Sequence, residues 1–178
     1  MTNRVFFNVA AGVVLLDQLT KLLVTQGIGL YEEVTVIPGF FVLTNVRNPG
    51  AAWGLFRQFP DVLTALAVAA AAGIALFRRA LARDHFGQEA ALAILLGGVL
   101  GNVLDRARLG SVVDFLEFDL GFMQWPTFNL ADASICVGVG LYLMLSLLHA
   151  RHALNPTLGP VGPESPAVSR GTSTADGG

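Results

Sequence analysis

The stretch GGVLGNVLDR, residues 97–106, begins apolar and ends polar. Gly97 and Gly101 are four residues apart, and small residues at that spacing let a second helix approach closely inside a membrane. Asn102 and Arg106 are also four residues apart, so their side chains share one face of a helix. We therefore predict a membrane helix that packs tightly along its apolar part and carries polar side chains at its end.

The composition of the whole chain agrees with a membrane protein. Of its 178 residues, 53% are hydrophobic and 13% are charged, and the mean hydropathy is +0.61. Soluble domains carry about 25% charged residues, so the chain falls in the integral membrane class and membrane lipids are expected partners. The net charge is −2 and no basic stripe is present, so no nucleic acid partner is expected.

Four apolar stretches are long enough to cross a bilayer, which needs about 20 residues and at least about 17. We therefore predict an all-α polytopic membrane protein with four transmembrane helices. The first stretch is interpreted as an uncleaved span, because its apolar run continues into polar residues at helical spacing and no small-x-small cleavage site follows. The expected spans are residues 5–24, 62–77, 88–104 and 131–150.

The distribution of basic residues predicts the orientation. Arg78, Arg79 and Arg83 form a compact cluster in the short loop after the second span, and such clusters stay in the cytoplasm. Both termini are then cytoplasmic, in a multi-pass protein of the cytoplasmic (inner) membrane. Lys21 and four arginines lie on the opposite side, so the raw counts nearly tie and the prediction depends on the compact cluster.

The segments outside the spans differ in character. Residues 31–44 are rich in β-branched and aromatic side chains, which predicts a small extracytoplasmic β element within an insert of about residues 28–58, between helices 1 and 2. Residues 110–130 carry five aromatic side chains and are predicted to form a belt at the membrane interface. The expected domain is residues 1–154, and residues 155–178 are expected to be a disordered cytoplasmic tail.

Polar side chains near the spans gather on the outer side in this topology. A charged residue at the bilayer centre costs about 2.5–3.5 kcal/mol, so each such residue needs a reason. The cytoplasmic helix ends show no comparable group in the sequence, and this asymmetry favours a functional site. The set is Asp17, Lys21, Asn48, Asn102, Asp105, Arg106, Asp114, Asn129 and Asp132.

Simpler explanations exist for parts of this set. Asp17 and Lys21 are spaced to form an ion pair within one helix. Asn129 and Asp132 are spaced as a helix N-cap and an acidic residue near the positive end of the helix dipole. Gly50 would let the backbone come close to an extended peptide, although alone it is only a loop signal.

The available side chains favour carboxylate chemistry. No Ser–His pair fits a nucleophilic site, Cys136 is predicted to be a packed thiol, and no metal-ligand spacing appears. Asp114 lies between apolar residues, which tends to raise a carboxyl pKa. Asp114 and Asp132 could therefore share one proton, with one carboxylate activating a water and the other donating to a carbonyl. A proton- or cation-coupled carrier and a noncatalytic scaffold are the two alternatives.

Five motifs in order give a specific resemblance. The chain resembles the bacterial lipoprotein signal peptidase family, also called signal peptidase II. The motifs cover the chain from about residue 17 to 135, and Trp53 stands where phenylalanine is expected. They are DQLTK (17–21), NPGAAWG (48–54), GGVLGNVLDR (97–106), VVDF (112–115) and FNLADASI (128–135).

The resemblance implies an aspartic endopeptidase that needs no cofactor. It implies cleavage of prolipoprotein signal peptides just before a diacylglyceryl-modified cysteine, and binding of globomycin-type cyclic peptide inhibitors. Asp114 and Asp132 become the catalytic pair near the extracytoplasmic surface of a protein expected to be a monomer. The supporting residues, together with those added from the sequence pattern, are Asp17, Lys21, Asn48, Gly50, Asn102, Arg106 and Asn129.

Overall fold

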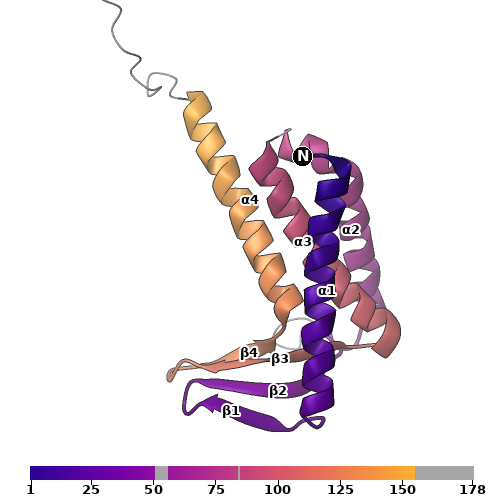
Figure 1. The fold of residues 1–178 in the computed structure, drawn as a ribbon, viewed down its shortest axis with the longest axis vertical. Coiled ribbons are helices and arrows are strands. Elements are labelled where there is room, and N and C mark those ends of the chain that lie inside the picture. The colour runs from indigo at the N-terminus through magenta and orange to yellow at the C-terminus, as the bar shows by residue number, and fades with distance from the viewer. Residues whose placement is uncertain (51–55, 84, 155–178) are drawn as a thin grey trace, which may run out of the picture.

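A computed structural model describes residues 1–50, 56–83 and 85–154. Four long helices form a bundle, and a four-stranded sheet lies at one end of it (Figure 1). The tail and Trp53 lie outside the described residues. In chain order the elements are α1 (Asn3–Gly27), β1 (Glu33–Ile37), β2 (Phe41–Asn48), α2 (Pro60–Ala82), α3 (Phe86–Leu109), β3 (Val112–Asp119), β4 (Gln124–Phe128) and α4 (Leu130–Leu154).

The four helices are those predicted, but each is longer than its apolar stretch. They contain 23 to 25 residues, or about 35–38 Å at 1.5 Å per residue, against about 30 Å of hydrocarbon. All four are apolar enough to cross a membrane. Their outer faces carry leucines that are more than half exposed, such as Leu15, Leu66 and Leu76. Such faces suit lipid, and the polar ends continue the helices toward the headgroups.

Helix α3 is the centre of the bundle. Half of the most apolar 18-residue stretch of α3 is buried, against 6% to 17% of the same stretch in the other three helices. Helix α3 also contacts all three of them. A Cβ at Gly97 would lie 2.7 Å from the carbonyl oxygen of Ala10 in α1, and a Cβ at Gly98 would lie 2.5 Å from that of Ala131 in α4. The close packing predicted from the glycine spacing is therefore present, and it lies within one bundle.

The sheet is larger than the sequence predicted. The β element was expected only between the first two helices, and that placement was incomplete. Strands β3 and β4 come from the segment between α3 and α4, and the order β1-β2-β3-β4 is antiparallel throughout. The aromatic side chains of this segment stack within the sheet as well: Phe118 lies 4.7 Å from Phe41 and 5.9 Å from Phe128 between ring centroids.

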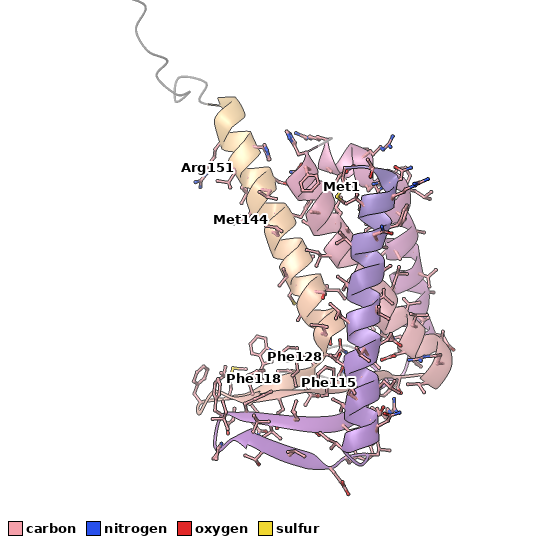
Figure 2. The ribbon with its side chains drawn as sticks, in the orientation of Figure 1. Met1, Phe115, Phe118, Phe128, Met144 and Arg151 are labelled. Atoms are coloured by element: carbon pink, nitrogen blue, oxygen red, sulfur yellow. The ribbon has the colours of Figure 1, made fainter. Side chains whose placement is uncertain are left out.

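The sheet and the N-terminus lie at opposite ends of the bundle. Figure 1 shows α1 running from the labelled N-terminus to the sheet, and α4 running from the sheet back toward the same end as the N-terminus. In Figure 2, Phe115, Phe118 and Phe128 mark the sheet end, whereas Met1 and Arg151 lie far from it. The up-and-down arrangement therefore brings the extracytoplasmic residues of the prediction to one end.

The prediction that the other helix ends lack a polar cluster is wrong. Arg78 and Glu89 are both buried there, with 3.9 Å between Arg78 Nη1 and Glu89 Oε1. Arg78 also donates to Asn3 and lies over the ring of Phe6, 4.4 Å from its centroid. Polar asymmetry between the two ends is therefore a weaker argument for function than the detailed geometry at the sheet end.

Candidate active site

Asp114 is the third residue of β3, the strand that joins the two halves of the sheet. Val112 and Phe118 share its face of the strand, because side chains alternate along a strand. The Asp114 side chain is 1% exposed, and both of its oxygens accept hydrogen bonds. Asn48 Nδ2 donates to Oδ2 over 2.9 Å, and Asn129 Nδ2 donates to Oδ1 over 2.7 Å. The carboxylate is thus fixed from β2 and from the start of α4.

Asp132 lies in the first turn of α4. The backbone N–H of Asp132 donates to Asn129 Oδ1 over 2.9 Å, and the Asn129 N–H donates to Asp132 Oδ2 over 3.3 Å. This reciprocal pattern is a capping box, so the capping interpretation of these two residues is confirmed. Asn102 Nδ2 also donates to Asp132 Oδ1 over 2.7 Å. The contacts between Asn129 and Asp132 therefore cap α4 and also fix the orientation of the Asp132 carboxylate.

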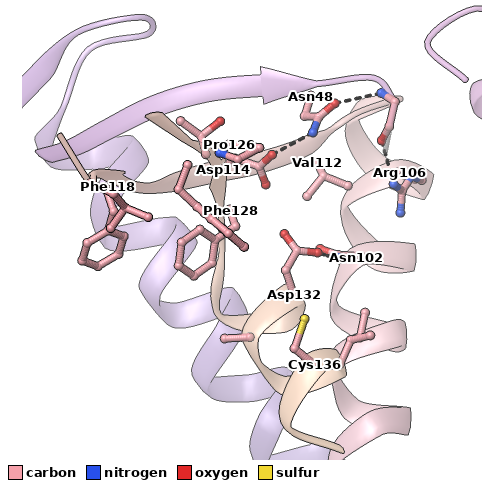
Figure 3. Close-up of a pocket in the computed structure, with 16 residues that line it drawn as sticks. Asn48, Asn102, Arg106, Val112, Asp114, Phe118, Pro126, Phe128, Asp132 and Cys136 are labelled. Atoms are coloured by element: carbon pink, nitrogen blue, oxygen red, sulfur yellow. Dashed lines mark hydrogen bonds between the residues drawn. The ribbon is translucent and has the colours of Figure 1, made fainter. Parts of the chain in front are cut away.

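The two aspartates line one cavity of about 630 Å³. Figure 3 shows Asp114 pointing into this cavity from the sheet and Asp132 pointing into it from the first turn of α4. Asn48, Asn102 and Arg106 lie at its edge. Most of the remaining lining is apolar, and it includes Val112, Leu120, Trp125, Pro126, Phe128 and Ile135. In the parts of the chain that the structure describes, no three His, Cys, Asp or Glu side chains are placed to hold a metal ion.

The environment of Asp114 favours its protonated form. Burial raises the pKa of the Asp114 carboxyl to about 7, and the nearby charge of Asp132 acts in the same direction. Hydrogen bonds from Asn48 and Asn129 and the charge of Lys21 oppose the rise in pKa. A carboxyl with this pKa holds or releases a proton near neutral pH, which general acid–base catalysis requires.

A buried ionic cluster between α1 and α3 lies next to the residues that hold the two aspartates. Lys21 Nζ lies 2.9 Å from Asp17 Oδ2 and 2.9 Å from Asp105 Oδ2. The predicted ion pair between Asp17 and Lys21 is present, and Asp105 completes it. Lys21 Nζ also donates to Asn102 Oδ1 over 3.1 Å. Asp105 was in the polar set expected on the outer side but was not among the expected supporting residues.

Arg106 and Gly50 meet at the rim of the cavity. Arg106 Nη2 donates to the carbonyl oxygen of Gly50 over 3.1 Å, and the Gly50 N–H donates to Asn48 Oδ1 over 2.9 Å. The partner of the Arg106 guanidinium is thus a backbone carbonyl. This chain of contacts links α3 to the Asn48 amide that holds Asp114.

Two features escaped the sequence interpretation. Cys136 was predicted to be a packed thiol, and this is wrong: it is exposed and lines the cavity, because it lies one helical turn after Asp132 on the same face. Gln18 was not assigned a role, yet its Nε2 donates to Asp17 Oδ2 and Asp105 Oδ1, each over 3.1 Å. The signal available in the sequence was a glutamine next to an aspartate within an apolar stretch.

Comparison with known proteins gives a consistent family. The sequence profile described as Signal peptidase (SPase) II matches residues 9–148. The lipoprotein signal peptidase of Geobacter sulfurreducens is 43% identical over 143 residues, which cover 79% of this chain and 89% of that protein. The lipoprotein signal peptidase of Bacillus pumilus is 36% identical over 152 residues, which cover 85% of this chain and 98% of that protein.

Solved structures agree at the level of the fold. One bacterial membrane enzyme superposes with a TM-score of 0.77 at 29% identity, covering 90% of this chain and 96% of that chain. A second bacterial membrane enzyme gives 0.73 at 31% identity, covering 82% and 94%. The fold and the comparisons thus place the chain among bacterial membrane enzymes.

The chain belongs to the signal peptidase II, or lipoprotein signal peptidase, family. Membership implies a peptidase that removes signal peptides from prolipoproteins, in a multi-pass protein of the inner membrane.

Proposed function

We propose that the chain is an aspartic endopeptidase that cleaves prolipoproteins just before their diacylglyceryl-modified cysteine, with Asp114 and Asp132 as the catalytic pair. The observation that carries this proposal is the shared cavity. A buried carboxylate, Asp114, and a partly buried one, Asp132, point into it from different elements. Five hydrogen bonds from amide or backbone N–H groups hold these two residues or their partners.

The pair works with one proton. Two carboxylates in a partly buried site do not both stay ionised, so the site holds one acid and one base at neutral pH. The ionised carboxylate takes a proton from a water while the water oxygen attacks the scissile carbonyl carbon. The protonated carboxylate donates its proton to the carbonyl oxygen, which gives a tetrahedral diol. Return of a proton to the amide nitrogen lets the C–N bond break and releases the two products.

The surrounding polar residues keep the pair in place. Asn48 and Asn129 hold Asp114, and Asn102 holds Asp132. Gly50 and Arg106 tie the chain just after β2 to α3 at the edge of the cavity. Asp17 and Lys21 support these residues from α1.

The remaining apolar lining suits a lipid-modified substrate. Apolar surface beside the carboxylates comes from Phe118, Trp125, Phe128 and Ile135, and the cavity lies where the sheet meets the first turns of α4. Acyl chains of the substrate, or a globomycin-type cyclic peptide, would occupy this part of the cavity. In the proposed orientation the sheet and the cavity are extracytoplasmic, both termini are cytoplasmic, and the monomer is sufficient. Residues 1–154 form the peptidase domain.

The carrier alternative fits the geometry less well. A carrier places its acidic residues near the bilayer midplane, whereas Asp114 lies on a strand outside the helices and Asp132 lies in the first turn of α4. A noncatalytic scaffold would tolerate the loss of either carboxylate.

Substitution of the carboxylates tests the proposal. Asp114→Asn and Asp132→Asn, each assayed in detergent on a lipidated prolipoprotein, should abolish cleavage while circular dichroism and thermal unfolding stay close to wild type. Asp119→Asn is the matched control, because Asp119 is an exposed carboxylate on the same strand as Asp114. Near wild-type cleavage by either dyad variant would show that the assignment is wrong.

A further inference from the structure

We propose that Lys21 is a positioning residue that sets the two catalytic aspartates relative to each other. Its ammonium joins Asp17 and Asp105, and each of these carboxylates holds the backbone N–H of the residue that precedes one catalytic aspartate. The inference rests on the proposed function, because it takes Asp114 and Asp132 as the catalytic pair.

The ionic cluster of Lys21, Asp17 and Asp105 is fully buried. Lys21 is 2% exposed, and Asp17 and Asp105 are both 0% exposed. The ammonium lies 2.9 Å from one oxygen of each carboxylate, and these carboxylates come from different helices. A buried charge pair that loses one partner is strongly destabilised, so the geometry of both carboxylates depends on this ammonium. Gln18 Nε2 also contacts both carboxylates, but it carries no charge.

Each carboxylate uses its other contacts to reach the backbone of the site. Asp17 Oδ1 accepts from the N–H of Ala131 over 2.9 Å, and Ala131 immediately precedes Asp132. Asp105 Oδ2 accepts from the N–H of Val113 over 3.2 Å, and Val113 immediately precedes Asp114. The two contacts are alike, although Ala131 lies in the first turn of α4 and Val113 lies in β3.

Lys21 also reaches the pair through amide side chains. It donates to Asn102 Oδ1 over 3.1 Å, and this contact turns the Asn102 Nδ2 group toward Asp132. Asn129 Nδ2 donates to the same Asn102 oxygen over 3.3 Å and to Asp114 over 2.7 Å. One ammonium is therefore connected to both catalytic aspartates by backbone and by side-chain contacts, without facing the cavity itself.

Arg108 provides a matched control. It also contacts Asp105, with 3.0 Å between Arg108 Nη2 and Asp105 Oδ1, but its side chain is 59% exposed. Among the described residues, its hydrogen bonds and ion pair go to Asp105 and Gln18 and not to Asp17, so it does not link the two carboxylates directly. Exposed ion pairs contribute little to stability. Arg108→Met therefore removes a cation from Asp105 and leaves the contacts of Lys21 with Asp17 and Asp105 in place.

The test compares Lys21→Met with Arg108→Met in the full-length protein, with a lipidated prolipoprotein as substrate. Lys21→Met should lower kcat by about 100-fold, the size of effect that misplacement of reacting groups by about 1 Å produces, while KM changes little. Amide hydrogen exchange should become faster in residues 110–115 and 128–133 and stay unchanged in α2. Arg108→Met should keep kcat within about twofold of wild type.

A second variant covers the case in which Lys21→Met does not fold. Asp17→Asn weakens the contact that holds the Ala131 N–H and leaves the contact between Asp105 and the Val113 N–H in place. Amide hydrogen exchange should therefore become faster in residues 128–133 and stay slow in 110–115. Wild-type kcat in Lys21→Met, or exchange that rises equally in all helices, overturns the positioning role. Asp114→Asn and Asp132→Asn in the same assay separate the two proposals: if they retain cleavage, the proposed function fails, and if they abolish it while Lys21→Met does not, only this inference fails.

Discussion

Asn129 Nδ2 lies 2.7 Å from Asp114 Oδ1, and the same Asn129 side chain accepts through Oδ1 from the backbone N–H of Asp132. One amide thus contacts the side chain of one candidate catalytic residue and the backbone of the other. It ties the first turn of α4 to β3, so a single residue contacts both members of the pair directly.

Substitution of Asn129 should separate its two roles. Asn129→Ser retains a good N-cap but is too short to reach Asp114, so cleavage should fall sharply while the melting temperature stays near wild type. Asn129→Ala loses both contacts and should unfold more easily by about 1 kcal/mol. Cleavage rates and thermal unfolding in detergent, measured on both variants, check this. Full activity of the serine variant would show that the contact with Asp114 is not needed.

A methyl group at Gly101 should disturb the site from within the bundle. A Cβ there would lie 2.6 Å from Asp17 Oδ2, closer than real contacts allow, so Asp17 must move. Because Asp17 holds the N–H of Ala131, Gly101→Ala should lower kcat by about 10- to 100-fold. Gly12→Ala on α1 is the control, since a Cβ at Gly12 has no neighbour within 4 Å. Equal kcat in the two variants would contradict the expected effect.

The single thiol should report on occupancy of the cavity. Cys136 is exposed and lines the cavity that holds both aspartates. A maleimide should therefore label the native protein and block cleavage, whereas Cys136→Ala should cleave normally and resist labelling. A bound globomycin-type cyclic peptide should slow the labelling, which mass spectrometry measures directly. Labelling that proceeds at an unchanged rate with saturating peptide would place the inhibitor elsewhere.

The pKa of Asp114 predicts how stability depends on pH. Its folded value of about 7 lies above the ordinary value of 3.8, so the folded state binds this proton more tightly than the unfolded state. The resulting stabilisation is complete below about pH 4 and is lost as pH rises toward 7. With about 1.4 kcal/mol per pKa unit, it amounts to at most about 4 kcal/mol.

The measurement is thermal unfolding between pH 4 and 8. The melting temperature of the wild type should fall across this range, and Asp114→Asn should show a clearly flatter dependence because this carboxyl no longer titrates. A parallel fall in both proteins would assign the pH dependence to other groups. Asp119→Asn serves again as the control that keeps the wild-type slope.

The helices could be predicted from the sequence because their signal is local. Each apolar stretch carries its own evidence of length, and the glycine spacing in residues 97–106 correctly predicted close packing around α3. Strands β3 and β4 could not be predicted in the same way. Their pairing depends on partners such as Val46, which faces Asp114 from a strand 68 residues away in sequence. Strand formation depends on such neighbours more than on the residues themselves.

The candidate site was predicted unevenly for a similar reason. The available carboxylates and the family resemblance both indicated Asp114 and Asp132, and the helical spacing indicated the pair of Asp17 and Lys21. The roles of Asp105 and Gln18 depend on contacts between α1 and α3. The rotation of two helices about their axes decides which polar side chains meet, and a sequence pattern does not give that rotation.

The sheet joins segments that the ribosome makes at different times. Asn48 and β2 precede α2, whereas both candidate carboxylates follow α3. While the first half of the protein is being inserted, it carries the amide that will hold Asp114 but neither member of the pair. The candidate site therefore cannot form until β3 and the start of α4 have been made, and β3 then pairs with a β2 segment that was made earlier.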